Sequence, residues 1–440
     1  MSVVEPVIVP RADHPISRRD IDSDALRVLY RLREHHHVAY LVGGSVRDLI
    51  LGRRPKDFDI GTSAHPYQIK RLFRNCWIIG RRFRLAHIKF GMKTIEVATF
   101  RQNVPEPLPE LERGAVAPPD EPQVVASSPA NPMVHPDNTF GTPEEDAFRR
   151  DFTINGLFYD IATYSVIDYV GGLADLERRV IRAIGDPHVR FVEDPVRMLR
   201  AAVLAARLGF DMDDLVLDAI ARHRGLIVKA SPARLMEEYF KILRSGYAEA
   251  SFRALGRVRL LELVTPELRS PPDAVWDSLA RLDTYRQRFP GAPPELTNAI
   301  LVGALLVPLG ALNRRPAGGQ APPDPRGERL SFGMLPVAKR DLERLRQLLT
   351  IAPRLVDPDV PPRVARSLPH RPAFADALVW EEVFGDTPER LAHWAHVSRQ
   401  RAQPTEGPPG EAAAGSRPAG RRRRRRRRRG RGGGPSTPGV

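Results

Sequence analysis

The stretch LVGGSVRDLILGRRPKDFDIGTS, residues 41–63, constrains the fold more strongly than any other part of the sequence. Its spacing predicts a buried strand over 38–44 that ends at two glycines, a short helix over 46–52, and a second strand that carries Asp57 and Asp59. Side chains at positions i and i+2 of a strand share one face, so both carboxylates are expected on the same side. Two adjacent carboxylates repel each other, which indicates that a cation lies between them.

These residues suit a site for a triphosphate and a divalent metal ion. Gly43 and Gly44 let the backbone approach the phosphates and donate N–H groups to them, and Arg47 adds a charged contact. Asp57 and Asp59 supply the hard oxygen ligands that Mg²⁺ prefers, and two ions held there would activate a hydroxyl and stabilise a leaving pyrophosphate. A DxD pair alone is more typical of a capped turn, but the double glycine upstream favours the metal site.

A third acid is expected at the same site. Asp151 follows two arginines in RRDFTIN, residues 149–155, and precedes an apolar segment that places it at the edge of a buried element. Glu96, in the predicted strand TIEVATF, is an alternative. The sequence leaves the choice between Asp151 and Glu96 open.

The stretch EDPVRMLRAAVLAARLGF, residues 193–210, predicts a helix with Asp194 as its N-cap and Pro195 at its first position. Arg197 lies three residues after Asp194, so both side chains can face one small spot. An aspartate accepts hydrogen bonds and an arginine donates them, which complements the donor and acceptor on the edge of adenine. A capping aspartate beside an intrahelical ion pair is the alternative interpretation.

Composition narrows the class of protein. The chain of 440 residues has a formal net charge of +15, of which +10 comes from twelve arginines and two glutamates in residues 401–440. The single cysteine excludes an internal disulfide and a multi-cysteine metal site. The longest apolar run, 299–312, contains Pro308 and is too short for a membrane span, so it predicts a buried core helix. The N-terminus lacks the basic start of a signal peptide. We therefore expect a cytoplasmic protein that does not contact a membrane.

The pattern predicts an α+β fold in which a mixed β-sheet with helices forms a head, followed by an all-helical neck and body and a disordered basic tail. Alternating residues predict a hairpin over 86–100 around Gly91, and apolar spacing is helical almost throughout from about residue 176. The expected units are an N-terminal extension (1–20), the head (21–175, with a flexible proline-rich insertion at 103–136), the neck (176–245), the body (246–401) and the arginine-rich tail (402–440).

Four motifs in this order resemble the bacterial members of the tRNA nucleotidyltransferase/poly(A) polymerase family, over about residues 10–245. They are LVGGSVRDLILGRRPKDFDIGTSAHP, RRDFTINGLFYD, DYVGGLADLERRVIRAIGDP and FVEDPVRMLRAAVLAARLGF. The resemblance implies a nucleotidyltransferase head in which Asp57 and Asp59 hold the catalytic metals and Asp151 is the third active-site aspartate. It further implies that Asp194 and Arg197 read the incoming base. The complete set of nucleotide-binding residues implied by the resemblance is Gly43, Gly44, Arg47, Arg150, Asn155, Asp194, Arg197 and Arg200.

Two activities share this kind of head: addition of CCA to tRNA and addition of poly(A) to RNA 3′ ends. The segment IIGRRFRLAHIKF, residues 78–90, and the arginine-rich tail resemble bacterial poly(A) polymerases. The prediction is therefore a template-independent adenylyltransferase that adds AMP from ATP to RNA 3′ ends with Mg²⁺ or Mn²⁺, and a CCA-adding enzyme is the alternative. A catalytically silent RNA-binding protein is disfavoured, because it has no reason to keep repelling carboxylates together. Association with RNA-degradation or RNA-chaperone proteins is left open.

Overall fold

The head is built on one mixed sheet of eight strands, in the order β1-β8-β7-β2-β3-β6-β5-β4. The structure is a computed structural model that describes residues 5–80, 84–102, 140–313, 331–386, 388–391 and 394. The strands are β1 (Val7–Val9), β2 (Ala39–Val42), β3 (Ile60–Thr62), β4 (Cys76–Ile79), β5 (Leu85–Phe90), β6 (Lys93–Thr99), β7 (Leu157–Asp160) and β8 (Ser165–Asp168). Strands β3 and β6 pair in parallel, and the other neighbouring pairs of this sheet are antiparallel.

Helices cover the two faces of this sheet unequally. The helices of the head are α1 (Ser23–Glu34), α2 (Gly44–Ile50), α3 (Pro66–Leu72), α4 (Pro143–Phe148) and α5 (Gly172–Arg178). Helices α1 and α3 pack on the face that buries Ile60 and Val97 in the main hydrophobic core. On the other face, a smaller core around Val42 and Phe158 lies under Ala147 of α4, at the β2–β7–β8 side of the sheet. Asp59 and Glu96 directly precede the core residues Ile60 and Val97, so their side chains project from that second face.

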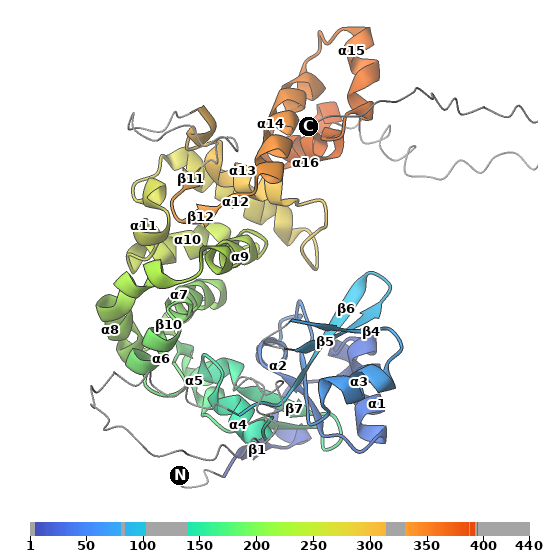
Figure 1. Cartoon of the computed structure of the whole chain (residues 1–440), viewed down its shortest axis with the longest axis vertical. Coiled ribbons are helices and arrows are strands. Elements are labelled where there is room, and N and C mark those ends of the chain that lie inside the picture. Colours follow the sequence, from blue (N-terminus) through green and yellow to red (C-terminus); the bar gives the residue numbers. More distant parts are fainter. Residues whose placement is uncertain are drawn as a thin grey trace, which may run out of the picture.

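The chain then continues as helices that curve away from the head in an arc, with the last helices at the far end (Figure 1). These helices are α6 (Pro187–Glu193), α7 (Val196–Leu208), α8 (Asp214–His223), α9 (Pro232–Leu243), α10 (Ala248–Arg257), α11 (Leu261–Val264), α12 (Asp273–Gln287), α13 (Asn298–Leu306), α14 (Lys339–Val356), α15 (Pro362–Ser367) and α16 (Phe374–Phe384). Two pairs of short strands interrupt them: β9 (Val180–Ile181) with β10 (Asp211–Met212), and β11 (Ser331–Phe332) with β12 (Leu335–Pro336). The fold class is therefore the predicted α+β arrangement, with these small additions to the helical part.

Several local predictions are confirmed. Hairpin β5–β6 turns at Gly91, whose φ of +59° is the left-handed conformation that glycine adopts without strain. Helix α13 is buried from Ala299 to Leu306, as an entirely apolar core helix should be. None of the described helices is long and apolar enough to cross a membrane.

Two boundaries predicted around the site are wrong. Strand β3 begins at Ile60, where pairing with Val97 of β6 starts, so Asp57 and Asp59 lie in the segment that leads into the strand. Helix α7 begins at Val196, one residue later than predicted; Pro195 already has helical φ and ψ of −59° and −22°, and Asp194, which also ends α6, has the extended backbone of an N-cap. The capping contact itself is present, since Asp194 Oδ1 accepts the Val196 N–H at 3.2 Å.

Two predicted segments lie outside the described residues. They are the insertion at 103–136 and the tail at 402–440. Their expected flexibility and disorder therefore stay predictions.

Candidate active site

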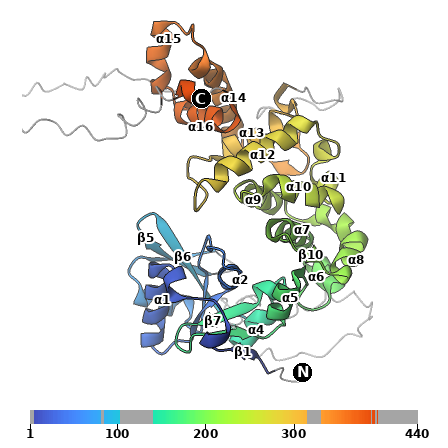
Figure 2. The same cartoon turned by 180° about the vertical axis from the view of Figure 1, so that it is seen from behind.

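A cavity of about 530 Å³ lies between the head and the first helices of the arc. Figure 2 shows α2 on the side of the head that faces α7. Residues of the head that line the cavity are Gly43, Gly44, Arg47, Asp59, Arg149, Arg150, Asp151, Phe152 and Asn155. Residues of α7, α9 and their flanks that line it are Asp194, Arg197, Arg200, Val203, Leu204, Arg207, Glu238, Lys241, Ile242 and Ser245. Cations therefore dominate the wall, as an anionic ligand requires.

The double glycine forms a tight floor to this cavity. Gly43 has φ +70° and ψ −130°, a conformation that an L side chain would strain. A Cβ at this position would also lie 2.8 Å from Arg150 Nη1, so a side chain would push this guanidinium aside. The glycine thus keeps both the turn into α2 and the position of Arg150 available to a ligand.

Arg47 is buried under this floor and does not point freely into the cavity. Its guanidinium donates to Asp48 Oδ1 from Nε at 2.9 Å and from Nη2 at 2.7 Å, and it also donates to Asn155 Oδ1. The other oxygen of Asp48 accepts from Arg207 Nη2 of α7 at 3.1 Å. Burial lowers the pKa of Arg47 relative to an exposed arginine, although Asp48 opposes the shift. This cluster joins α2 of the head to α7.

Asp59 and its neighbours form the acidic part of the site. Asp59 is exposed to the open cavity, and partial desolvation by the surrounding protein, together with the charges of Glu96 and Asp57, raises its pKa to about 6. Arg150 opposes the shift. Asp57 is 73% exposed, and Lys56 Nζ lies 3.8 Å from its Oδ2. The carboxylates near Asp59 therefore repel one another more than the nearby cations neutralise them.

Asp151 has the opposite environment. Its side chain is only 10% exposed, and its Oδ2 forms an ion pair with Arg200 Nη2 of α7. Its Oδ1 accepts from the Phe152 N–H at 2.9 Å and from Asn155 Nδ2 at 3.1 Å. Burial alone would raise its pKa, but the Arg200 charge and these hydrogen bonds hold the pKa below its usual range. Asp151 is a neutralised carboxylate that joins the head to α7.

Asp194 and Arg197 line the same cavity, but each already has partners. Both oxygens of Asp194 accept from Arg234, at 2.9 and 2.6 Å. Arg197 Nη1 donates to the Arg190 carbonyl and to Glu193 Oε2, both at 3.0 Å. A carboxylate has about four lone-pair sites and a guanidinium has five N–H donors, so both groups keep capacity for a ligand.

The structure thus gathers most of the predicted site residues around one cavity. The exceptions are Asp57 and the alternative third acid Glu96, which lie close enough to Asp59 to raise its pKa but do not line the cavity. Sequence analysis missed Asp48 and Arg234, which pair with the predicted Arg47 and Asp194, and Arg207, which pairs with Asp48. The motif GGSVRD contains Asp48, and an aspartate beside an arginine in a short apolar helix was the available signal for a buried pair.

The donor set is consistent with a divalent cation at Asp57 and Asp59. Both carboxylates are hard oxygen donors, and the pKa of Asp59 is raised by desolvation and by the negative charges of Glu96 and Asp57, which a cation would compensate. Within the described part of the chain, no group of three or more His, Cys, Asp or Glu side chains is arranged to hold a metal ion. Mg²⁺ commonly takes one or two carboxylates and completes its shell with water and substrate phosphates.

Family models match two parts of the chain. Residues 39–182 match the poly A polymerase head domain, and residues 209–270 match the probable RNA and SrmB-binding site of polymerase A. Both matched segments contribute residues to the cavity or to the helices behind it.

Curated relatives extend the likeness. The chain is 47% identical over 261 residues to poly(A) polymerase I of Escherichia coli O6:H1, which is 59% of this chain and 54% of that protein. It is 40% identical to poly(A) polymerase I of Haemophilus influenzae (59% and 55%) and 35% identical to the CCA-adding enzyme of Bacillus subtilis (54% and 54%). The chain therefore spans about half the length of the curated relatives it matches.

Among solved structures, the chain is similar to the CCA-adding enzyme of Bacillus stearothermophilus in complex with CTP. The TM-score is 0.56 at 25% identity, covering 86% of this chain and 81% of that one. This likeness includes the helical arc as well as the head.

Proposed function

We propose that this chain is a template-independent enzyme that adds AMP from ATP to RNA 3′ ends. Through residues 39–182 and 209–270 it belongs to the tRNA nucleotidyltransferase/poly(A) polymerase family. In this reaction the 3′ oxygen of RNA bonds to the α-phosphorus of ATP, the bond to the bridging oxygen breaks, pyrophosphate leaves, and the hydroxyl proton passes to solvent. The proposal rests on one observation, the cavity that is lined by Gly43, by Asp59 and by the arginines of α7.

The residues of the head take the phosphates in this proposal. The N–H groups at the start of α2 and the Arg150 guanidinium beside Gly43 would bind the triphosphate. Asp57 and Asp59 would hold Mg²⁺ or Mn²⁺, which when bound would favour the ionised 3′ hydroxyl and compensate the charge on the leaving pyrophosphate. Glu96 rather than Asp151 is proposed as the third acid, because Glu96 acts on Asp59 while Asp151 is neutralised by Arg200.

Asp194, which ends α6, and the arginines of α7 take the base and hold its geometry in this proposal. Arg234 fixes the Asp194 carboxylate, whose remaining lone pairs would accept the amino group of adenine. Arg197 would donate to the ring nitrogen, and Arg200 with Asp151 would keep α7 at its distance from the head. Guanine and uracil present the reversed donor and acceptor and would leave both side chains unpaired, at about 1–3 kcal/mol for each unsatisfied group.

Primer extension tests this proposal. The purified protein is given a non-tRNA oligonucleotide and each of the four nucleoside triphosphates in separate reactions, and product lengths are resolved. Long ladders with ATP alone support the proposal. Extension that needs a tRNA end and stops after CCA contradicts it in favour of a CCA-adding enzyme. The cytoplasmic location and an association with RNA-degradation or RNA-chaperone proteins stay predictions from the sequence.

A further inference from the structure

One row of side chains runs from Asp59, just before β3, across the three adjacent strands β6, β5 and β4. Because Ile60 pairs with Val97, the preceding residues Asp59 and Glu96 are neighbours. Glu96 pairs with His87 of β5, and His87 pairs with Trp77 of β4. Directly paired residues project from the same face, so Asp59, Glu96, His87 and Trp77 form one continuous row.

This row is open to solvent along its length. The side chain of Glu96 is 50% exposed and that of His87 is 21% exposed, and His87 Nε2 lies 3.5 Å from Glu96 Oε1. Trp77 is 48% exposed, an unusual state for so large an apolar surface. Helix α3 contacts β4 and β5 from the opposite face, where Ile69 and Ile88 are buried. The hydrophobic core of these strands therefore lies on the face opposite Trp77, and the indole is not a core side chain left uncovered.

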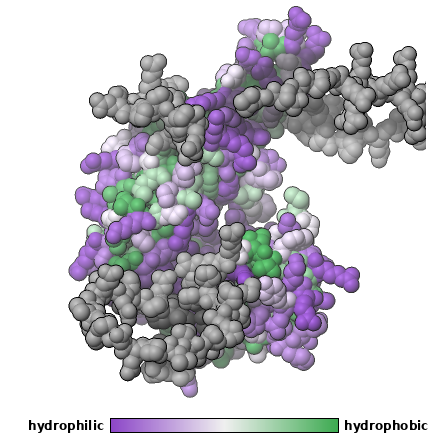
Figure 3. Space-filling view, in the orientation of Figure 1, coloured by the Kyte–Doolittle hydropathy of each residue, from purple (hydrophilic) through white to green (hydrophobic). Residues whose placement is uncertain are grey.

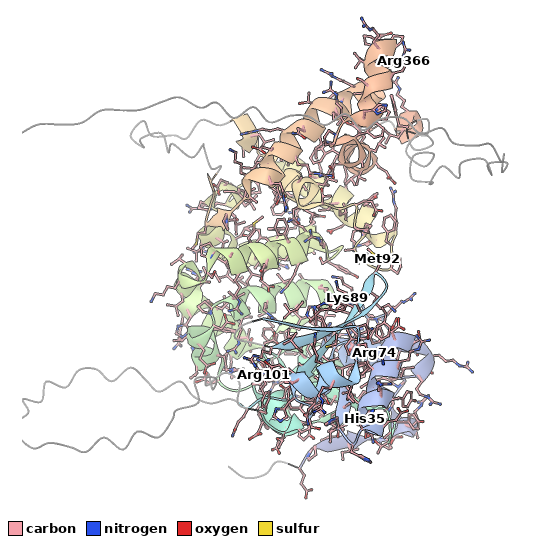
Figure 4. All side chains as sticks on the ribbon, turned by 45° about the vertical axis from the view of Figure 1, so that its right-hand side comes forward. His35, Arg74, Lys89, Met92, Arg101 and Arg366 are labelled. Carbon is pink, nitrogen blue, oxygen red and sulfur yellow. The ribbon has the colours of Figure 1, made fainter. Side chains whose placement is uncertain are left out.

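A cation accompanies the indole. Lys89, two residues beyond His87 on β5, places its Nζ 5.2 Å from the centre of the Trp77 ring. Figure 4 shows Lys89 and Met92 on the hairpin β5–β6, which extends from the head toward the helical arc. In Figure 3 the head shows an apolar area over these strands, beside the hollow that separates head and arc. An aromatic face next to a cation offers a stacking surface for a base and a charge for its phosphate.

We propose that Trp77 and Lys89 form a subsite for the single-stranded RNA substrate, a few nucleotides upstream of the 3′ end that reacts near Asp59. Adjacent strands lie about 4.8 Å apart, so Trp77 is roughly 14 Å from Asp59 along the row. An RNA strand lying on this face would place its 3′ hydroxyl at the carboxylates and stack an upstream base on the indole. Stacking does not depend on base identity, which suits an enzyme that must accept many 3′ ends. This inference rests on the proposed function for its substrate, but the subsite can be measured without catalysis.

The test is equilibrium binding of a fluorescent single-stranded RNA oligonucleotide, without nucleoside triphosphate, to Trp77→Ala, Trp77→Phe and Lys89→Gln. The matched control is Tyr67→Ala, since Tyr67 on α3 is 60% exposed and has Arg84 5.7 Å from its ring centre, but lies on the helix that covers the opposite face. We expect Trp77→Ala to weaken binding by roughly 5- to 100-fold, Trp77→Phe to restore most of it, and Tyr67→Ala to leave it unchanged. Lys89→Gln should weaken binding and lower its dependence on salt.

A second measurement locates the base. An abasic site is moved one nucleotide at a time from the 3′ end of the oligonucleotide. At one position, the abasic site is expected to weaken RNA binding by the wild-type protein as much as Trp77→Ala does, and to leave RNA binding by the Trp77→Ala protein unchanged. Equal binding by wild type and Trp77→Ala, or a loss in Tyr67→Ala as large as in Trp77→Ala, overturns the subsite. If the wild type binds RNA through Trp77 yet extends no primer, the proposed reaction fails while the subsite stands.

Discussion

Two groups of carboxylates lie at or beside the cavity, and they differ in burial and in their cation partners. Asp48 and Asp151 are buried and each faces an arginine of α7, and these pairs hold the head and the arc together. Asp59 lines the cavity near Asp57 and Glu96, and no arginine pairs with Asp57 or Asp59 among the described residues. The opposite pKa shifts of Asp59 and Asp151 express this difference. The carboxylates that join the head to α7, Asp48 and Asp151, are paired with arginines. Those proposed to bind metal, Asp57 and Asp59, have no such partner in the part of the chain that the structure describes, so their negative charge is uncompensated.

The largest effect on activity is expected when Asp57 or Asp59, the carboxylates without an arginine partner among the described residues, loses its charge. Asp57→Asn and Asp59→Asn should each reduce nucleotide addition by at least about 100-fold, because outer-shell changes alone typically cost 10–100-fold at metal sites. Neither variant should lower the thermal unfolding midpoint, since each relieves repulsion in the metal-free protein. Initial rates of primer extension and thermal unfolding measure the two effects. A fully active Asp59→Asn enzyme would contradict the metal assignment.

The same Asp→Asn substitution at Asp48, whose carboxylate is paired with arginines, should lower the stability of the fold. Asp48→Asn would leave the buried Arg47 guanidinium without its ion pair, and breaking a buried pair from one side costs about 3–5 kcal/mol in unfolding free energy. Chemical denaturation of the wild type and Asp48→Asn checks this loss, with Asp57→Asn as the control of equal charge. If Asp48→Asn is as stable as the control, the pairs at α7 do not hold the head in place.

The two groups also predict opposite dependences on pH in metal-free protein. With a pKa of about 6, folded Asp59 binds a proton between pH 4 and 6 that the unfolded chain does not, so this group favours the folded state more as pH falls from 6 toward 4. The pKa of Asp151 lies below its ordinary value of 3.8, so its contribution is present above pH 3.8 and is lost as pH falls further.

Thermal unfolding of the wild type and Asp59→Asn in the presence of a chelator measures the first effect. The unfolding midpoint of the wild type should rise relative to that of the variant between pH 7 and 4.5. A difference that does not vary with pH would show that Asp59 ionises normally.

The smallest effect at low salt is expected from the tail. Residues 401–440 carry +10 of the total charge of +15, and phosphate contacts weaken as salt rises. Truncation after residue 402 should leave AMP addition unchanged at low salt and reduce the slope of log K against log salt for RNA binding. An unchanged slope would show that the tail does not contact RNA.

The sequence predicted what depends on local pattern. The glycine turn at Gly43, the hairpin around Gly91 and a core helix within 299–312 follow from residue type and periodicity, and the structure contains them, with the helix ending at Leu306. The prediction of a strand at Asp57 was wrong, because the start of β3 depends on where β3 pairs with β6. That pairing is a contact between segments distant in the sequence.

The partners of the site residues could not be predicted for the same reason. Arg234 reaches Asp194 across 40 residues, and Arg207 reaches Asp48 across 159. A sequence motif identifies a carboxylate but not the arginine that neutralises it. The choice between Glu96 and Asp151 stayed open in the sequence because only the fold reveals which of the two carries a cation.

Binding of Mn²⁺ alone, followed by its electron paramagnetic resonance signal, tests the central claim most directly. The titration compares wild type, Asp59→Asn and Asp151→Asn, with folding of each variant checked by circular dichroism. We predict that Asp59→Asn loses the tightest Mn²⁺ site and that Asp151→Asn keeps it, because the Asp151 carboxylate is already occupied by Arg200. Loss of the site in Asp151→Asn together with its retention in Asp59→Asn would contradict the division of the cavity into a metal-binding side and a structural side.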